Sequence, residues 1–217
     1  MPGKVSVRRP SEGPESRTTI LRAAEHIFAE RGLAGARIDA IARAARVNKA
    51  LIYYYFKGKD ALYLAVVEEH MKEFSRQALE LLARDEGVKE KILHYVSMHF
   101  DFIAARTNYP RLLQRFMMVD SRPFMQIRTK YFSPVAKKFG MVIEQGIRSG
   151  EVCASDSTHT AISLVALTVF YFSAAPVLKA AGIINDPYQK TQLARRKKEV
   201  LEFVSRALFK NRGASSK

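Results

Sequence analysis

The segment from Ile38 to Lys59 constrains the fold more than any other part of the chain. Its small and apolar residues predict a short helix, a tight turn over 46–48 and a second short helix that ends near Tyr55. Asn48 is a good N-cap for the second helix, because its side-chain oxygen can accept a backbone N–H of the first turn. Two short helices joined in this way form the helix-turn-helix pattern of proteins that bind DNA.

The second predicted helix has two different faces. Ile52 and Phe56 are four residues apart and are expected to face the core. The outward side carries neighbouring tyrosines and lysines, which packing alone does not explain. Hydroxyl and ammonium groups suit phosphate oxygens, so these side chains predict a DNA-binding surface. Its predicted members are Arg37, Asn48, Lys49, Ala50, Leu51, Tyr53, Tyr54, Tyr55, Lys57 and Lys59.

Side-chain chemistry assigns a role to most of these residues. Lys49 is the predicted guanine contact, because a lysine can donate to the acceptors on the edge of that base. Ala50 and Leu51 offer only apolar contacts, and Tyr53 or Tyr54 is expected near base edges or thymine methyl groups. Phosphate contacts are expected from Arg37, Tyr54, Tyr55, Lys57 and Lys59.

The same segment resembles the DNA-binding signature of the TetR family of transcriptional regulators. That signature has an Ile-Ala pair, an Ala-Gly-Val-Ser-like turn, a Leu-Tyr-x-His/Tyr-Phe segment and a lysine followed by an acidic residue. The matching positions are residues 41–42, 45–48, 52–56 and 59–60. The resemblance implies a three-helix DNA-binding domain, completed by a helix that precedes this segment.

Four positions depart from the signature. Arg46 stands where the family usually has glycine, which predicts a left-handed backbone at a less favourable residue. Asn48 replaces the usual serine as a cap. Ala50 stands where glycine is common, and Ala36 stands where a threonine usually caps the first helix, so that cap is expected to be missing or moved.

The net charge of +15 predicts a polyanionic partner. Most of this charge lies at the two ends of the chain. Residues 1–60 contain 12 Lys/Arg against 6 Asp/Glu, and residues 185–217 contain 9 against 3. Residues 61–184 are nearly balanced, with 15 against 12. Basic residues that only keep the protein soluble are the alternative interpretation, above all at the C-terminal end.

The chain beyond position 60 shows helical periodicity and no strand-like alternation, so we expect an all-α fold. A long helix from Asp60 to about Arg84 is expected to connect the DNA-binding domain to the rest. The predicted organisation is a disordered basic arm (1–16), a three-helix helix-turn-helix domain (17–62), a larger helical-bundle domain for effector binding and dimerisation (63–210) and a disordered tail (211–217).

Several helix boundaries follow from single residues. Gly32 is expected to end the first helix, and Pro134 to kink or break a long helix in the second half. Pro187 is expected at the first position of the last helix. The predicted N-caps are Ser16, Asp156 and Asp186.

The last two predicted helices, 156–181 and 187–210, carry more apolar surface than the end of a chain needs. A second copy of the chain would bury this surface, so we expect a homodimer. The TetR resemblance implies the same, since that family dimerises through a four-helix bundle made from its last two long helices. The alternative is that both helices complete only their own core. The most apolar stretch, 161–175, is expected to be too short to span a bilayer, so no membrane partner is expected.

The resemblance also implies an apolar pocket for a small-molecule effector in the second half. Soft and aromatic side chains of the middle helices suit such a pocket. For each of these residues, an ordinary place in the core is the alternative. The candidate lining residues are His99, Phe100, Ile103, Phe116, Met117, Phe124 and Phe172.

Catalytic signatures are missing from the sequence. It has no Gly-rich phosphate loop, no Cys/His set with zinc spacing and no Gly-x-Ser-x-Gly motif. We therefore expect neither an enzyme nor a cofactor or metal. The single cysteine, Cys153, excludes an internal disulfide, fits a reducing cytoplasm and is expected to be a buried structural thiol.

Together these features predict a cytoplasmic, dimeric repressor that binds a double-stranded DNA operator and is released by a small apolar effector. One alternative is a structural DNA-binding protein without an effector, which would show almost no preference for one sequence over another. The other alternative is a regulator whose second half binds another protein in place of a small molecule.

Overall fold

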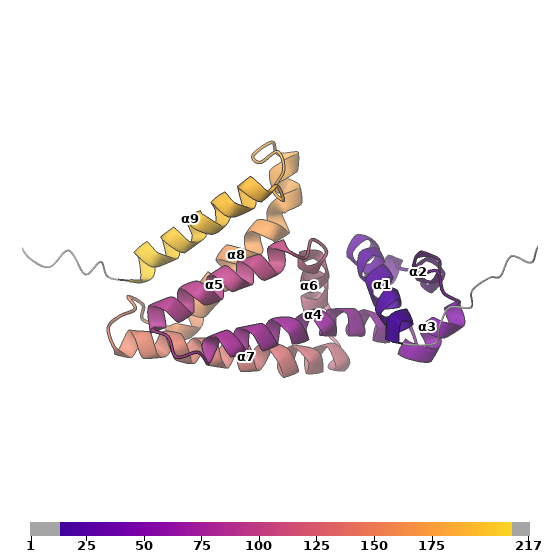
Figure 1. Ribbon diagram of the computed structural model, residues 1–217, viewed down its shortest axis with the longest axis horizontal. Helices are drawn as coiled ribbons and strands as arrows, with labels where there is room; N and C mark the ends of the chain where they lie inside the picture. The colour runs from indigo at the N-terminus through magenta and orange to yellow at the C-terminus, as the bar shows by residue number, and fades with distance from the viewer. Residues whose placement is uncertain (1–13, 210–217) are drawn as a thin grey trace, which may run out of the picture. The chain divides into compact units, whose positions relative to one another are not determined.

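The computed structural model describes residues 14–209, and this range folds into nine α-helices without a β-sheet (Figure 1). An isolated antiparallel bridge joins Val152 to Phe209. The prediction of an all-α fold is confirmed. The helices are α1 (Pro14–Gly35), α2 (Ile38–Ala45), α3 (Lys49–Phe56), α4 (Lys59–Leu82), α5 (Val88–Ala104), α6 (Tyr109–Met118), α7 (Arg122–Arg148), α8 (Ser157–Ala180) and α9 (Lys190–Leu208).

The chain divides into two compact units between Glu69 and His70, a point inside α4. The N-terminal unit contains α1, α2, α3 and the first part of α4. The C-terminal unit contains the rest of α4 and α5 to α9. The disorder expected for residues 1–16 and 211–217 concerns segments that, apart from residues 14–16, lie outside the described residues.

The N-terminal unit is held together by a small apolar core to which each of its helices contributes. Phe28 of α1 meets Tyr63 of α4 edge to face, with ring centroids 5.0 Å apart. Arg17 of α1 lies over the ring of Phe56 and pairs with Glu69 at 3.5 Å. Each large apolar side chain buried in this way contributes about 1.5–3 kcal/mol to folding. The largest fully buried side chains are Ile20, Phe28, Ile41, Ile52, Leu62 and Tyr63.

The first helix begins earlier than expected. It starts at Pro14, whose fixed φ suits the first turn of a helix, so the expected cap Ser16 is instead a buried residue inside that turn. Gly32 has the left-handed φ of 69° predicted for a terminating glycine. The chain nevertheless resumes a helical turn after this kink and ends it at Gly35.

The C-terminal unit is built around α5, which packs against α7, α8 and α9 (Figure 1). Aromatic side chains dominate these contacts. Tyr95 of α5 stacks on Phe139 of α7, with ring centroids 3.9 Å apart. Phe100 of α5 meets Phe172 of α8 at 5.0 Å. Helix α5 is therefore the central element of this unit.

The two C-terminal helices begin differently from one another. Asp156 caps α8 as predicted, because its carboxylate accepts the backbone N–H of His159 at 2.7 Å. The predicted start of α9 is wrong, since this helix begins at Lys190. Asp186 instead accepts the N–H of Tyr188 at 3.1 Å, and the carbonyl of Pro187 accepts the hydroxyl of Tyr171 at 2.7 Å. These contacts keep the segment before α9 in a turn.

Two further single-residue expectations can be compared with the structure. Helix α7 continues through Pro134, so of the predicted kink or break the break does not occur. Pro134 is exposed, so water can reach the carbonyl of Lys130 that the proline leaves without its helical donor. Cys153 is exposed and not buried. It follows the buried Val152 in extended backbone, where successive side chains point to opposite sides.

Helix α8 leaves much of its apolar surface uncovered in the single chain. Within the described range it is the one helix long and apolar enough, by length and composition, to cross a membrane, and 28% of its most apolar window is buried. The apolar stretch 161–175 lies within this helix, which extends beyond it on both sides. The exposed face contains Ile162, Phe170 (70% exposed) and Val177, and Phe203 of α9 is exposed as well.

Candidate nucleic-acid interface

The turn between α2 and α3 has the geometry expected of a helix-turn-helix. Arg46 is left-handed, with φ 55° and ψ 40°, as the departure from glycine predicted. The backbone N–H of Val47 donates to the carbonyl of Ala42 at 3.0 Å, which closes the end of α2. Asn48 caps α3 as predicted, accepting the N–H of Ala50 at 2.9 Å. Arg37 precedes α2 without a side-chain cap, which confirms the expected missing cap.

Helix α3 divides into the two faces that the sequence predicted. Ile52 and Phe56 are buried in the core of the N-terminal unit. Tyr54 is 77% exposed, and Tyr53 is exposed beside it. Tyr55 is half-buried, and its ring meets that of Tyr54 edge to face at 5.2 Å. The outward face of this helix therefore presents two bare phenol groups.

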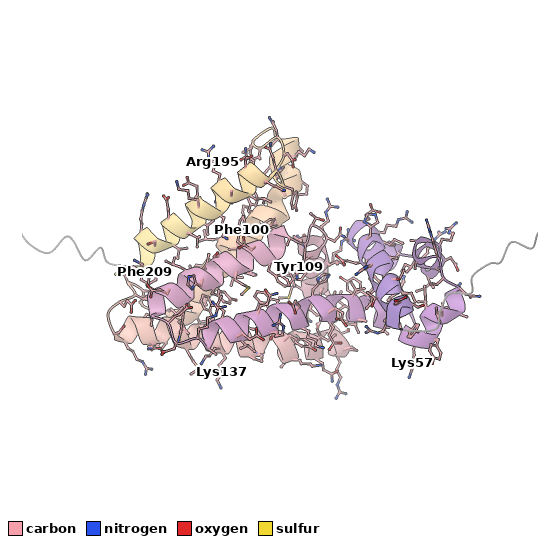
Figure 2. All side chains as sticks on the ribbon, in the orientation of Figure 1. Lys57, Phe100, Tyr109, Lys137, Arg195 and Phe209 are labelled. Atoms are coloured by element: carbon pink, nitrogen blue, oxygen red, sulfur yellow. The ribbon has the colours of Figure 1, made fainter. Side chains whose placement is uncertain are left out.

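The lysines that follow α3 have different roles from one another. Lys57 ends the helix with a left-handed φ of 56°, and its side chain is exposed at the edge of the unit (Figure 2). Lys59, a predicted phosphate contact, makes hydrogen bonds within the protein. Its ammonium donates to the carbonyls of Ala34 and Ala36, at 3.3 and 3.2 Å. It thus ties the start of α4 to the end of α1.

Lys49, the predicted guanine contact, is paired with an acidic residue. Its ammonium lies 2.9 Å from the carboxylate of Asp39, in the first turn of α2. The hydrogen bond and charge of Lys49 lower the pKa of Asp39, and the carboxylate raises the pKa of Lys49. Ala50 is exposed and Leu51 is half-buried on the same helix.

A second basic surface lies on α2 and includes a residue that the sequence analysis missed. Arg37, Asp39, Arg43 and Val47 line a shallow concavity of about 450 Å³. Both arginines are exposed. Arg43 is six residues from Arg37. Its positive charge and its outward position in the helical repeat of α2 could have been recognised from the sequence. We add Arg43 to the candidate interface.

Six of the seven candidate effector residues are buried and fall into two groups within the C-terminal unit, whereas Met117 is 48% exposed. The ring of Phe116 stacks near that of Phe124, with centroids 5.5 Å apart. The second group joins α5 to α8 and comprises His99, Phe100, Ile103 and Phe172. The three described grooves of this unit are lined by other residues.

One buried polar contact lies in the second group. A ring nitrogen of His99 lies 2.8 Å from the hydroxyl of Thr168, and that hydroxyl donates to the carbonyl of Val165 at 2.7 Å. Burial lowers the pKa of His99 to about 4, so the ring is neutral at physiological pH. Within the described residues, no group of three or more His, Cys, Asp or Glu side chains is placed to hold a metal ion.

Comparison with known proteins relates this geometry to a family. Residues 20–66 match the family model of bacterial regulatory proteins, tetR family. The probable HTH-type transcriptional regulator YttP of Bacillus subtilis (strain 168) is 29% identical over 154 residues, which is 68% of this chain and 72% of that protein. The fatty acid metabolism regulator protein of the same organism is 24% identical over 185 residues, 85% of this chain and 91% of that protein.

A solved structure extends the likeness to the whole fold. The transcriptional regulator FadR from Bacillus subtilis, in complex with stearoyl-CoA, superposes with a TM-score of 0.68 at 22% identity, over 88% of this chain and 98% of that one. The family match covers α2, the left-handed turn, the capped α3 and the start of α4, which are the elements that present the tyrosine and lysine surface. Residues 20–66 therefore form a DNA-binding domain of the type found in bacterial regulatory proteins of the tetR family, and the chain is a DNA-binding transcriptional regulator.

Proposed function

We propose that the chain is a cytoplasmic, dimeric repressor that binds double-stranded operator DNA and releases it when a small-molecule effector binds. The observation that best supports DNA binding is that α3 has one buried face and one exposed face. Ile52 and Phe56 are buried, while Tyr53 and Tyr54 are exposed next to the basic side chain of Lys57. Phenol and ammonium groups on a bare helix face suit phosphate oxygens and base edges of a duplex.

Within this surface we assign roles according to exposure and charge. Arg37, Arg43, Tyr54 and Lys57 are exposed and hold phosphates. Base contacts come from Lys49, Ala50 and Tyr53 at the start and middle of α3, the part of a recognition helix that enters the major groove. Asn48 caps this helix, and Leu51 and Tyr55 support its exposed face. Lys59 positions the unit through its contacts with α1.

The uncovered apolar face of α8 and α9 supports a homodimer. A monomeric soluble protein rarely exposes so many large apolar side chains on one helix face, and a second copy of the same face would cover them. A dimer presents two recognition helices to half-sites about 34–36 Å apart, or a multiple of this distance. One short helix alone reads too few base pairs to select an operator.

We assign the effector site to the aromatic interior between α5 and α8. The FadR complex with stearoyl-CoA supports an apolar effector, and the His99–Thr168 contact supplies a polar group inside an otherwise apolar region. The interior is packed, so an effector must separate side chains such as Phe100 and Phe172 that touch here. Because α4 contributes residues to both units, a shift of α4 on effector binding carries the change to the DNA-binding unit.

Selection from a random-sequence duplex pool tests the DNA half of this proposal. The selected duplex is then compared with a shuffled duplex of the same composition at fixed salt. We expect the selected duplex to bind about 10³-fold more tightly or better. Equal affinity for both duplexes would contradict the proposal and favour a structural DNA-binding protein.

Stearoyl-CoA tests the effector half, with free coenzyme A as the matched control. We expect stearoyl-CoA to raise the melting temperature of the free protein and to weaken binding of the selected duplex, whereas coenzyme A alone does neither. A set of shorter acyl-CoA and free fatty-acid probes defines the preferred apolar length. If no member of this set changes DNA affinity, the proposed apolar effector is wrong.

A further inference from the structure

One acidic side chain lies among the cations of the candidate DNA-binding surface. From Arg31 to Lys59 the sequence has seven Lys/Arg residues, and Asp39 is its single acidic residue. A carboxylate on a surface that meets phosphates opposes binding, because the phosphate backbone supplies much of the affinity through its charge. Its presence at this position therefore calls for a physical role.

The position of Asp39 identifies the side chain on which it acts. Its carboxylate lies 2.9 Å from the ammonium of Lys49, the first residue of the recognition helix α3. The side chains of Asp39 and Lys49 are 65% and 48% exposed, so their contact can open without unpacking the core. The pair joins α2 to α3 on the outward side. The ammonium of Lys49 can contact either Asp39 or DNA, but it cannot interact fully with both at once.

We infer that Asp39 is an affinity-limiting residue, an intramolecular counter-ion that competes with DNA for the ammonium of Lys49. This inference rests on the proposed DNA binding. To contact DNA, Lys49 must give up part of its attraction to Asp39, so each complex is weakened by the free energy of that pair. The loss is the same on every duplex at which Lys49 leaves Asp39, because it equals the free energy of the pair in the free protein and does not depend on the base that is contacted.

The neighbours of Asp39 make this exchange reversible. Arg43 and Arg37 line the same concavity as Asp39, and their charges also act on it. When Lys49 moves to DNA, the carboxylate keeps cationic neighbours and is not left isolated. An exposed ion pair is also a weak interaction, so DNA can compete with it.

A limit on affinity has a regulatory consequence. An effector can weaken operator binding only by its coupling factor, typically 5- to 150-fold. A repressor that binds DNA too tightly would stay on its operator after the effector has bound. Lowering the overall affinity through Asp39 keeps the complex within the range that an effector can release.

A double-mutant cycle on the full chain tests this inference. We use D39N, Lys49→Gln and the double variant, with the selected duplex and the shuffled duplex as probes. D39N frees the positive charge of Lys49 beside the duplex, and one additional effective cation at about 0.15 M salt changes affinity about fivefold, so D39N should bind both duplexes about fivefold more tightly. The slope of log affinity against log salt should steepen by about one. In the Lys49→Gln background, most of this gain should disappear.

Two further variants control the comparison. Glu30→Gln removes the same charge from α1 of the same unit, where Glu30 lies beside His26, and should change affinity much less than D39N. Asp39→Glu keeps the carboxylate and should stay near the wild-type affinity. Urea unfolding of each variant checks that the N-terminal unit remains folded.

Three results would overturn the inference. A changed base preference in D39N that persists in the Lys49→Gln background means that Asp39 contacts a base itself. A gain that persists fully in the Lys49→Gln background means that the carboxylate acts without Lys49. A loss of affinity on both duplexes means that the pair holds α3 in place. If the wild-type protein does not prefer the selected duplex, the proposed repressor function is wrong. That result is distinguishable from failure of the inference, because the effect of Asp39 on affinity can still be measured with the shuffled duplex.

Discussion

At the scale of single residues, neighbouring lysines with the same chemistry are expected to have separate functions. Lys57 is exposed, whereas the ammonium of Lys59 is held by the carbonyls of Ala34 and Ala36. Lys57→Gln should weaken binding to all duplexes and flatten the salt dependence by about one, without loss of stability. Lys59→Gln should lower the free energy of unfolding by about 1–3 kcal/mol, since it removes charge-assisted hydrogen bonds.

Urea unfolding and salt-dependent DNA binding of the two variants measure this difference. Each variant serves as the control for the other, because both remove one positive charge. If Lys59→Gln leaves stability unchanged and reduces the salt dependence as much as Lys57→Gln, the assignment of Lys59 to a structural role is wrong.

A pH dependence is expected from the buried His99. Burial lowers its pKa to about 4, while an unfolded histidine titrates near 6.5, so the unfolded chain binds a proton first as the pH falls. Its stabilising contribution is complete above about pH 7 and is lost as the pH falls from 6.5 towards 4. At pH 5 the loss is about 2 kcal/mol.

Urea unfolding at pH 7.5 and at pH 5 measures this loss. Carboxylates and other histidines also titrate, so the informative quantity is the difference between wild type and His99→Gln, which keeps a polar group near Thr168. The variant should lose about 2 kcal/mol less than wild type between the two pH values. An identical loss in both proteins would show that His99 is not the titrating group.

At the scale of elements, the capped recognition helix should depend on one side-chain oxygen. Asn48→Ala removes the acceptor for the N–H of Ala50 and should lower the free energy of unfolding by about 1 kcal/mol. Asn48→Ser keeps a capping oxygen and is the matched control. Urea unfolding should place the serine variant close to wild type. Equal losses in the two variants would mean that the cap does not stabilise α3.

The α2–turn–α3 element was predictable because its determinants are local. The left-handed Arg46, the cap Asn48 and the buried pair Ile52 and Phe56 each depend on residues a few positions away. The start of α9 was not predictable in this way. Asp186 and Pro187 carry a helix-start pattern, but the hydroxyl of a residue in α8 binds the Pro187 carbonyl and holds that segment in a turn.

The same distinction applies to the candidate site. Exposure of Tyr53 and Tyr54 followed from the helical period, whereas the partner of Lys59 lies some two dozen residues away in the sequence. The pairing of Asp39 with Lys49 also depends on how α2 crosses α3, which no spacing rule fixes. The sequence therefore identified the basic residues of this region, but not which of them already bind another group of the protein.

At the scale of the whole molecule, the exposed apolar face of α8 and α9 should control the oligomeric state. Phe170→Lys combined with Phe203→Lys places charges on that face and should convert a dimer into a monomer, with a large loss of operator affinity. Phe132→Lys changes another exposed phenylalanine, on α7, and is the control. Sedimentation analysis measures the mass. A double variant that stays dimeric would rule out this face as the interface.

The central claim is that two copies of the α3 surface, held together by the C-terminal helices, bind duplex DNA. A hydroxyl-radical footprint of the full chain on its selected duplex tests this claim directly. We expect two protected segments whose centres are about 34–36 Å apart, or a multiple of that distance, and both should fade in Lys57→Gln. A single protected segment, or protection spread evenly along the duplex, would contradict the account.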